Sequence, residues 1–320
     1  MAKLIDGLAL EITGRTLLAP DIVRIDFARA DGGELPPFSA GAHIDVAVDD
    51  GLVRQYSLCN DPAERHRYQI AVLREPQSRG GSIRVHDAFH PGRQVSVGTP
   101  RNLFALAQGG SRHVLIGGGI GITPIMSMAA TLASQGKSFD LHYCCRTPES
   151  AGFGDAVEAV GGRTYFSRHD GAPRFEPAAA LGSPRADTHV YVCGPAGFMN
   201  AVRDEAQRLG WADTNIHREL FEAAEPLVQA GDQPFDVCIA STGATFTIAP
   251  GTSVASILAD AGIDVPVSCE QGVCGTCVTA VLDGVPDHRD SYLTDEERDE
   301  GKLFTPCCSR ARSPLLLLDL

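Results

Sequence analysis

The sequence lacks the segments that mark membrane and secreted proteins. No apolar run approaches the ~20 residues of a membrane-spanning helix, and the first residues, Met-Ala-Lys-Leu-Ile-Asp-Gly, include no secretory apolar stretch. Internal repeats and low-complexity tracts are absent as well. We therefore expect a cytoplasmic protein, independent of membranes, whose ten cysteines are reduced thiols. A length of 320 residues predicts roughly two or three domains.

Positive charge is scarce. The chain has 27 Lys and Arg against 40 Asp and Glu, a net charge of −13, and residues 235–320 alone carry 13 acids against 5 bases, a net −8. Such an acidic chain does not suit nucleic acid, whose phosphates require a basic surface. The densest acidic run, residues 295–300, is either a solvated face or a docking patch for a basic redox partner.

Hydrolytic signatures are missing too, since no Ser-His-Asp array, His-rich metal spacing or pair of catalytic carboxylates stands out. The informative residues are cysteines. Cys269, Cys274 and Cys277 form a C-x4-C-x2-C run, and 29 residues separate Cys277 from Cys307. This is the plant-type spacing of [2Fe–2S] ligands, in which one tight loop supplies three thiolates and a distant segment the fourth. A zinc site is the alternative, but zinc ligands usually come as two C-x2-4-C pairs.

Two details of the cysteine run bear on this interpretation. Gly272 and Gly275 lie inside the loop, where positive φ angles and close backbone approach favour glycine. Cys308 follows Cys307 directly, so two thiols compete for the role of fourth ligand. Because neighbouring residues on a strand point to opposite faces, only one of them can reach the cluster. The spacing selects Cys307 and leaves Cys308 as a small core residue.

The distribution of apolar residues divides the chain. Short runs with period-2 character at 22–27, 43–48, 68–73 and 94–97 predict a small antiparallel barrel. From about residue 111, apolar strands at 113–116, 139–143, 163–166 and 189–192 alternate with Ala-rich segments of helical length, which predicts a parallel sheet covered by helices. A proline-containing linker then precedes a last unit from residue 235, with a hairpin near 241–244, a helix near 253–261 and a closing strand at 315–318.

Two glycine turns follow strands of the predicted parallel sheet. The first is Gly117-Gly-Gly-Ile-Gly-Ile-Thr-Pro124, in which we expect Thr123 to cap the next helix and Pro124 to occupy its first position. The second is Cys193-Gly-Pro195. Both turns would open at the carboxyl edge of the sheet, where glycine lets a pyrophosphate approach the N–H groups of a helix N-terminus. The pair of turns favours a dinucleotide site over plain strand–helix connections.

The predicted barrel contains two further motifs, Arg54-x-Tyr56-Ser57 and Arg79-Gly80-Gly81-Ser82. Arg54 and the amides of the glycine turn can hold a phosphate. Tyr56 can stack on a flat ring, and Ser57 can hydrogen-bond a ring nitrogen. Taken alone, such a stretch is most often an ordinary strand.

These motifs, in this order and over essentially the whole chain, resemble the phthalate dioxygenase reductase family, which includes the vanillate O-demethylase reductases. The resemblance implies a multidomain protein: an antiparallel β-barrel flavin domain at 1–106, an α/β parallel-sheet NAD domain at 107–226, a linker at 227–234 and an α+β, β-grasp plant-type ferredoxin domain at 235–320. It also implies that NADH reduces FMN and that single electrons pass through a [2Fe–2S] cluster to a terminal oxygenase, a Rieske-type aromatic oxygenase or O-demethylase. Flavin must stand between the other two because nicotinamide gives up two electrons together whereas the cluster accepts one.

Carried over residue by residue, the resemblance assigns the cofactor sites. Arg54 would contact the flavin phosphate, Tyr56 would pack on the isoalloxazine and Ser57 would face its reactive nitrogen. The other implied contacts are Gly80, Gly81 and Ser82 at the flavin phosphate, Gly118, Gly119, Thr123 and Pro124 along the dinucleotide, Cys193 and Gly194 near the nicotinamide, and Phe221 near the flavin. Ser57 and Cys193 are the expected catalytic residues, and Cys269, Cys274, Cys277 and Cys307 the expected cluster ligands.

Several alternatives stay open. Relatives often carry an acid after the arginine that ends the second strand of the NAD domain, where this chain has Arg146-Thr147. An acid there favours the bare ribose of NADH, so its absence weakens discrimination against NADPH, although NADH is the expected donor. FAD is the alternative to FMN, but no adenine-binding segment is evident in the barrel. The acceptor could instead be a haem-thiolate monooxygenase, and a third hypothesis is a non-catalytic flavin and iron–sulfur redox sensor.

Overall fold

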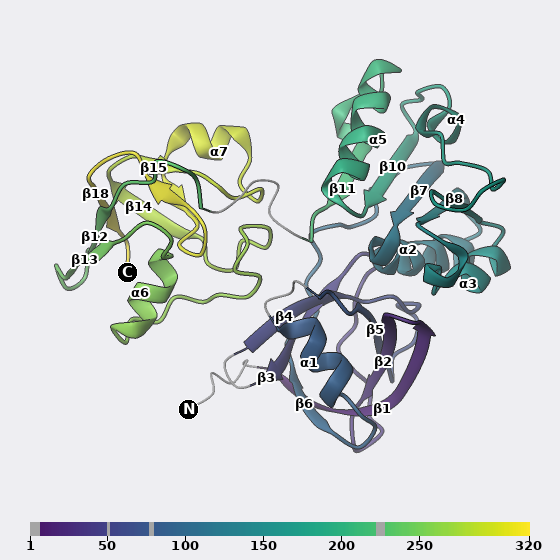
Figure 1. Ribbon diagram of the computed structural model, residues 1–320, viewed down its shortest axis with the longest axis horizontal. Coiled ribbons are helices and arrows are strands. Elements are labelled where there is room, and N and C mark those ends of the chain that lie inside the picture. Colours follow the sequence, from purple (N-terminus) through teal and green to yellow (C-terminus); the bar gives the residue numbers. More distant parts are fainter. Residues whose placement is uncertain (1–6, 50–51, 77–79, 222–227) are drawn as a thin grey trace. The chain divides into compact units, whose positions relative to one another are not determined.

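The computed structural model describes residues 7–49, 52–76, 80–221 and 228–320 (Figure 1). The chain divides into two units, Met1–Glu219 and Leu220–Leu320. The linker predicted at 227–234 and the Arg79 motif lie partly outside the described residues. Within the described ranges, no helix has the length and apolar character needed to cross a membrane.

The first unit begins with a six-stranded antiparallel sheet in the order β4-β3-β6-β1-β2-β5. Its elements are β1 Leu8–Ala19, β2 Ile22–Ala28, β3 His43–Asp49, β4 Leu52–Ser57, β5 Tyr68–Leu73, α1 Gly81–Ala88 and β6 Gln94–Val97. Just beyond β4, Leu58 pairs with Ile70 of β5, which brings the two edge strands together and closes a barrel. Ile44, Val46 and Val48 of β3 alternate into its core, as a half-buried strand requires. The predicted antiparallel barrel is confirmed.

The rest of this unit is a five-stranded parallel sheet in the order β11-β10-β7-β8-β9. Its strands are β7 Arg112–Gly118, β8 Ser138–Cys145, β9 Arg163–Phe166, β10 Thr188–Cys193 and β11 Ile216–Glu219. Its helices are α2 Ile122–Ser134, α3 Gly154–Ala159, α4 Pro177–Leu181 and α5 Ala196–Arg208, with 3-10 turns η1 Gly119–Gly121, η2 Pro148–Ser150 and η3 Asp213–Asn215. Because the strand order reverses between β7 and β10, the carboxyl ends of these two strands form the natural ligand site of an open sheet.

Two local predictions about this sheet were wrong. Helix α2 begins at Ile122, so Thr123 lies inside the helix and does not cap it, and Pro124 occupies the third helical position and not the first. The 3-10 turn η1 runs directly into α2, and the capping position belongs to Gly121, which has no side chain. The Thr123 hydroxyl donates to the carbonyl of Ile120 at 3.0 Å instead. Because η1 leads directly into α2, the helix begins without a side-chain cap.

The barrel and the parallel sheet share one hydrophobic core, in which Ala19, Ile22 and Phe104 pack with Leu115 and Ile122. Helix α2 packs against β7, β8 and β10, while α5 packs against β10 and β11 (Figure 1). This shared core fixes the end of the barrel strands against the carboxyl edge of the parallel sheet, which positions the site described below.

The second unit is built on a five-stranded mixed sheet in the order β13-β12-β18-β14-β16. Its elements are β12 Phe235–Ile239, β13 Thr245–Ile248, α6 Val254–Asp260, β14 Thr279–Asp283, α7 Asp295–Glu300, β16 Leu303–Phe304 and β18 Leu315–Leu318, and β15 Pro286–Asp287 pairs with β17 Arg310–Ala311. Leu316 and Leu318 are fully buried at the centre of the sheet, where β18 runs parallel to β12 and antiparallel to β14. The hairpin, helix and closing strand predicted for this unit are all present.

Candidate functional site

The predicted flavin-phosphate residues meet where β4 faces the start of α1. Arg54 lies on β4, and its side chain crosses Gly81 so closely that a Cβ at that glycine would be 2.6 Å from the Arg54 Cγ. Gly80 has a φ of +87°, and no atom lies within 4 Å of the position of its missing Cβ. An arginine, a left-handed glycine and a helix N-terminus together suit a phosphate. Ser82 also lies in this turn, where its hydroxyl accepts the Glu75 N–H at 3.1 Å.

Tyr56 and Ser57 are the last two residues of β4. Tyr56 is partly buried against the barrel core and stands opposite Ile44 on β3. Burial raises the pKa of its phenol well above the usual range, so the ring is a neutral, flat surface at all physiological pH values. Ser57 is buried at the last position of the strand. The two side chains therefore provide a ring face and a hydroxyl at the rim of the barrel.

The two predicted glycine turns lie against each other. A Cβ at Gly121 would be 2.5 Å from the carbonyl carbon of Cys193 and 2.6 Å from the nitrogen of Gly194. Gly194 in turn approaches Gly118, whose Cα would be 3.0 Å from a Cβ on Gly194. Only glycine permits this approach of the β7 and β10 ends. Of the predicted dinucleotide residues, Gly118 and Cys193 end β7 and β10, and Gly194 follows β10. Gly119 begins η1, and Thr123 and Pro124 lie in the first turn of α2.

A residue that the sequence analysis did not predict joins the flavin and dinucleotide sites. Glu219, the last residue of β11, accepts a hydrogen bond from the Ser57 hydroxyl at 3.3 Å and pairs in register with Cys193. The residue is partly buried, and desolvation raises the pKa of its carboxyl group to about 8, against the opposing effect of the Ser57 hydrogen bond. Burial is the main cause that raises the pKa of the Cys193 thiol, and the neighbouring Glu219 raises it further.

Barrel and parallel sheet therefore converge on three side chains, Ser57, Cys193 and Glu219, within one unit. At neutral pH the glutamic acid is protonated and the thiol is not ionised, so the junction carries no negative charge. No sequence signal pointed to Glu219, because the strand that carries it, β11, was not predicted. Phe221, two residues later, is half-exposed and belongs to the start of the second unit.

The four predicted cluster cysteines are all buried in the second unit and lie as two pairs. Cys269 interacts with Cys274. Cys307 interacts most strongly with Cys277 and less strongly with Cys308. A two-iron cluster needs four thiolates shared between its irons, which suits a two-by-two arrangement. Among the described residues, no group of three or more His, Cys, Asp or Glu side chains gathers around a single metal position.

Backbone geometry shapes the loop for inward-facing sulfurs. Gly272 and Gly275 have φ angles of +71° and +70°, and Glu270, at +54°, is the one described non-glycine residue with positive φ. The amide of Gln271 donates to the Cys269 sulfur at 3.3 Å, and that of Thr276 to the Cys274 sulfur at 3.4 Å. Such donors favour thiolate, and the hydrogen bonds from Cys269 and Thr276 lower the pKa of Cys274. The loop fits a [2Fe–2S] cluster.

The prediction that Cys307 and Cys308 lie on a strand was wrong. They lie in a turn in which the amides of Cys308 and Ser309 both donate to the Thr305 carbonyl, at 3.1 and 3.0 Å. A turn is needed here because the short strands β16 and β17 belong to different sheets. The two sulfurs nevertheless have different surroundings, since that of Cys308 contacts the Thr305 hydroxyl at 3.3 Å.

A buried carboxylate supports both halves of the ligand set. Asp290 accepts the amides of Tyr292 and Leu293 at 3.1 and 2.8 Å, and it accepts the hydroxyls of Thr305 and Ser309 at 3.3 and 3.4 Å. The next residue, Ser291, donates its amide to the Gly272 carbonyl at 2.8 Å. Asp290 therefore ties the loop of the first three cysteines to the turn that carries the fourth.

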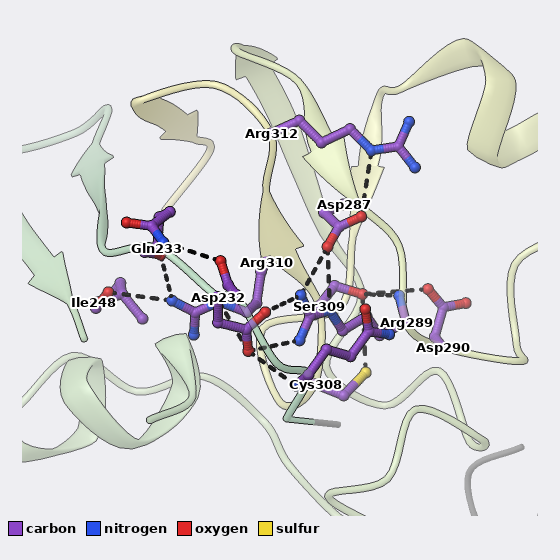
Figure 2. A network of polar contacts seen from close by, with 12 residues as sticks. Asp232, Gln233, Ile248, Asp287, Arg289, Asp290, Cys308, Ser309, Arg310 and Arg312 are labelled. Carbon is purple, nitrogen blue, oxygen red and sulfur yellow. Dashed lines mark hydrogen bonds and ion pairs between the residues drawn. The ribbon is translucent and has the colours of Figure 1, made fainter. Parts of the chain in front are cut away.

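An ion network extends from this turn to the start of the unit (Figure 2). Arg289 makes a bidentate pair with Asp232 at 2.6 and 2.9 Å and a second pair with Asp287 at 2.9 Å. Arg310 donates to the carbonyls of Gln233 and Ile248 and lies over the Phe235 ring. The Arg289, Asp232 and Arg310 side chains are each only 6% exposed. The network therefore fastens residues 232–235 to the segments that flank the cluster turn.

Known proteins are similar to this chain over nearly its whole length. Residues 238–312 match the model of the 2Fe-2S iron-sulfur cluster binding domain family. The chain is 49% identical to a vanillate O-demethylase oxidoreductase of Pseudomonas sp. (strain HR199 / DSM 7063) over 313 residues, which cover 97% of this chain and 98% of that protein. A solved structure of phthalate dioxygenase reductase, described as modular for electron transfer from pyridine nucleotides to [2Fe-2S], matches with a TM-score of 0.79 and 39% identity over 98% of both chains.

A third match links the same architecture to a different acceptor. The structure of an intact type IV self-sufficient cytochrome P450 monooxygenase aligns with a TM-score of 0.82 and 37% identity. The alignment covers 98% of this chain but 41% of that protein.

Proposed function

Because the chain belongs to the family of oxygenase reductases that includes vanillate O-demethylase oxidoreductase and phthalate dioxygenase reductase, we propose that it carries electrons from NADH through FMN and a [2Fe–2S] cluster to a terminal oxygenase. The protein works in the cytoplasm, where its thiols remain reduced. The flavin domain spans residues 1–106, the NAD domain 107–226, the linker 227–234 and the ferredoxin domain 235–320. The separate barrel, parallel sheet and mixed sheet support this division.

The observation that carries the proposal is the contact between Ser57 and Glu219 at the junction of the barrel and the parallel sheet. Flavin accepts two electrons together as a hydride and releases them one at a time. It is needed because nicotinamide gives up two electrons together, whereas the cluster accepts only one. Hydride transfer requires a donor–acceptor separation of roughly 3–3.5 Å. A flavin on Arg54, Tyr56, Ser57 and Gly80–Ser82 would meet a nicotinamide beside Cys193 and Gly194 at this junction.

Each junction residue has a defined task. Ser57 would present its side-chain oxygen to the reactive end of a bound flavin, and the hydrogen bond to Glu219 orients that side chain. Cys193 supplies a small, neutral side chain beside Glu219, so the nicotinamide can approach without a charged neighbour. Gly118 and Gly119, with Thr123 and Pro124 in the first turn of α2, hold the pyrophosphate at the helix N-terminus.

In the second unit, Cys269, Cys274, Cys277 and Cys307 hold the cluster. The amides of Gln271 and Thr276 donate to the sulfurs of two of these cysteines and raise the cluster potential by stabilising negative charge. The terminal acceptor is a Rieske-type aromatic oxygenase or O-demethylase, in keeping with the names of the relatives. A haem-thiolate monooxygenase is the second candidate acceptor, because a self-sufficient cytochrome P450 contains a segment with this fold over 98% of the chain.

Anaerobic reductive titration tests the proposal. The purified protein should take up about three electrons per chain, two into FMN and one into the cluster. Acid extraction should release FMN, and rapid mixing with NADH should reduce the flavin before the cluster. Extraction of FAD, or a metal content dominated by zinc, would contradict the cofactor assignment. Reconstitution with purified Rieske oxygenases and with a cytochrome P450 would then separate the two acceptors.

A further inference from the structure

The carboxyl ends of β8 and β9 present two arginines where NAD-binding sheets usually present an acid. Arg146 follows β8 directly, and Arg168 follows β9 by one residue. The Ser167 amide donates to the Cys145 carbonyl at 3.0 Å, and the Arg168 amide donates to the Arg146 carbonyl at 2.8 Å. These bonds continue the pairing of the two strands beyond their ends and hold the two arginines side by side along the backbone.

Neither guanidinium is neutralised within the described part of the chain. Arg146 and Arg168 are exposed, and no hydrogen bond or ion pair joins either side chain to another described residue. The acids nearby in the chain are Glu149 and Asp170, and no ion pair joins either of them to Arg146 or Arg168 in the described part of the chain. The pKa of Glu149 is lowered by its own backbone N–H and by the Thr147 hydroxyl. Two like charges held beside each other without an acid favour the binding of an anion.

The position of this basic pair corresponds to the adenosine end of the dinucleotide site. A row of aromatic side chains runs from the first glycine turn to β9: a Cβ at Gly118 would be 2.8 Å from the Phe198 ring, Phe198 lies 5.8 Å from Phe175, and Phe175 lies 5.4 Å from Tyr165. Tyr165 is on β9, three residues before Arg168. A dinucleotide whose pyrophosphate sits at the glycine turn can therefore extend along this row toward the arginines.

We infer that Arg146 and Arg168 form a binding site for the 2′-phosphate of NADPH, so that this chain accepts NADPH as a second hydride donor beside NADH. In dinucleotide-binding sheets, an acid at the end of the second strand hydrogen-bonds the free ribose of NAD, and an arginine there accommodates the 2′-phosphate of NADP. In this chain the second strand is β8, and Arg146-Thr147 follows it. The inference deepens the proposed function and rests on it, because it concerns the same nucleotide site.

The reaction itself is the same for both donors. The C4 atom of the nicotinamide transfers a hydride, with its two electrons, to the flavin. NADH thereby becomes NAD⁺, and NADPH becomes NADP⁺. The 2′-phosphate lies on the far ribose and takes no part in that step. Its only effect is on binding, and it should therefore change KM more than kcat.

Binding of 2′,5′-ADP and 5′-AMP to the full, flavin-loaded chain tests the inference without turnover. Isothermal titration should show 2′,5′-ADP binding more tightly, with an advantage that shrinks as ionic strength rises. Arg168→Ala and Arg146→Ala should each weaken 2′,5′-ADP by about tenfold, as expected for loss of one charge-assisted contact, and leave 5′-AMP within about twofold. Arg163→Ala is the matched control, since this exposed arginine lies at the opposite end of β9.

A second pair of variants keeps the local fold and adds the missing acid. Thr147 caps η2, and both Asp and Asn can take over a cap. Thr147→Asp should lower kcat/KM for NADPH by about tenfold and leave kcat/KM for NADH unchanged. Thr147→Asn, whose side chain has the shape of Asp without the charge, should leave both values unchanged. Equal affinity of the wild-type chain for the two nucleotides, or an equal loss in Arg163→Ala, would overturn the inference. Loss of NADH oxidation in the wild-type chain would instead contradict the proposed function.

Discussion

The sulfur of Cys308 lies directly against Gly272 of the cysteine loop. A Cβ at Gly272 would be 2.6 Å from this sulfur and 2.8 Å from the Cα of Asp290. Gly272 therefore has no room for a side chain, and the Cys308 sulfur fills the space beneath it. Cys307 interacts most strongly with Cys277, so the two adjacent cysteines have different partners. Cys308 packs under the loop, and Cys307 is the fourth ligand that we propose.

The division between these two cysteines can be measured. Cys307→Ala should abolish the visible absorbance of the cluster and its paramagnetic signal on reduction, because one iron loses a ligand. Cys308→Ala should keep both signals and cost about 1 kcal/mol of stability, as removal of one buried sulfur from a packed site does. The ligand assignment would be wrong if Cys308→Ala lost the cluster and Cys307→Ala kept it.

Cys274→Ser separates the two parts of the electron path. Loss of this thiolate should prevent normal cluster assembly and stop electron transfer to the oxygenase. Reduction of ferricyanide by NADH should persist at close to the wild-type rate, because ferricyanide can take electrons from the flavin. Both activities are followed spectrophotometrically on the same preparation. A Cys274→Ser protein that had also lost ferricyanide reduction would contradict the independence of the flavin and cluster units.

The contact between Ser57 and Glu219 should control flavin reduction. Ser57→Ala removes the hydroxyl at the reactive end of the flavin and should slow reduction by NADH by about 10²-fold, the usual loss for one transition-state donor. Glu219→Gln keeps a hydrogen-bonding group and should cost less, about tenfold. Stopped-flow absorbance of the flavin measures both rates. If the Ser57→Ala rate stayed within twofold of wild type, Ser57 would have no catalytic role.

Glu219 also predicts a pH dependence. Its pKa is raised to about 8 in the folded chain by burial, against roughly 4.3 when unfolded, so the folded state keeps a proton that the unfolded state has lost. The resulting stability is fully present below about pH 4.3 and is lost as the pH rises through about 8. Trp211, the single tryptophan, is buried in the first unit, which also contains Glu219. Thermal unfolding followed by Trp211 fluorescence should show the loss of stability with rising pH. Glu219→Gln should flatten it.

The buried pair of Asp232 and Arg289 should stabilise the second unit. Asp232→Ala leaves Arg289 with Asp287 alone and removes the ion pair of Arg310, which should cost about 3 kcal/mol because a buried charge loses its partner. Thermal loss of the cluster absorbance should therefore occur at a lower temperature. Asp260→Ala removes an equal charge from an exposed position and should change nothing. Equal melting temperatures of all three proteins would contradict this role of the network.

The acidic helix α7 offers a test of partner docking. Glu297 is engaged in a capping box with Thr294, and Asp295 lies 3.6 Å from Arg298. Glu300 pairs with Lys302 at 3.4 Å, which leaves Glu296 and Asp299 as the best positions for charge reversal. Glu296→Lys with Asp299→Lys should lower the association rate with the oxygenase by about tenfold at low salt and weaken its salt dependence. Asp260→Lys with Asp319→Lys is the control. Unchanged association kinetics would identify the acidic run as a solvated face.

Local patterns in the sequence determined the chemistry of this protein. The cysteine spacing predicts the cluster because three of the ligands lie on one loop. The glycine turns and the period-2 strands likewise predict the barrel, the parallel sheet and the dinucleotide site, since each depends on residues that are near neighbours in the chain. Among the strands that were missed, β1, part of β4 and β11 have weak or mixed alternation, and their pairing partners stabilise them.

Only the tertiary structure decided which distant side chains meet. Ser57 and Glu219 are 162 residues apart, and Asp232 and Arg289 are 57 apart, so no local pattern could pair them. The surroundings of Cys308 and the start of α2 at Ile122 also depend on neighbours from other segments. The physical reason is burial: the pKa of Glu219 and the ion pair of Asp232 arise when folding removes these groups from water, and that depends on how the whole chain packs.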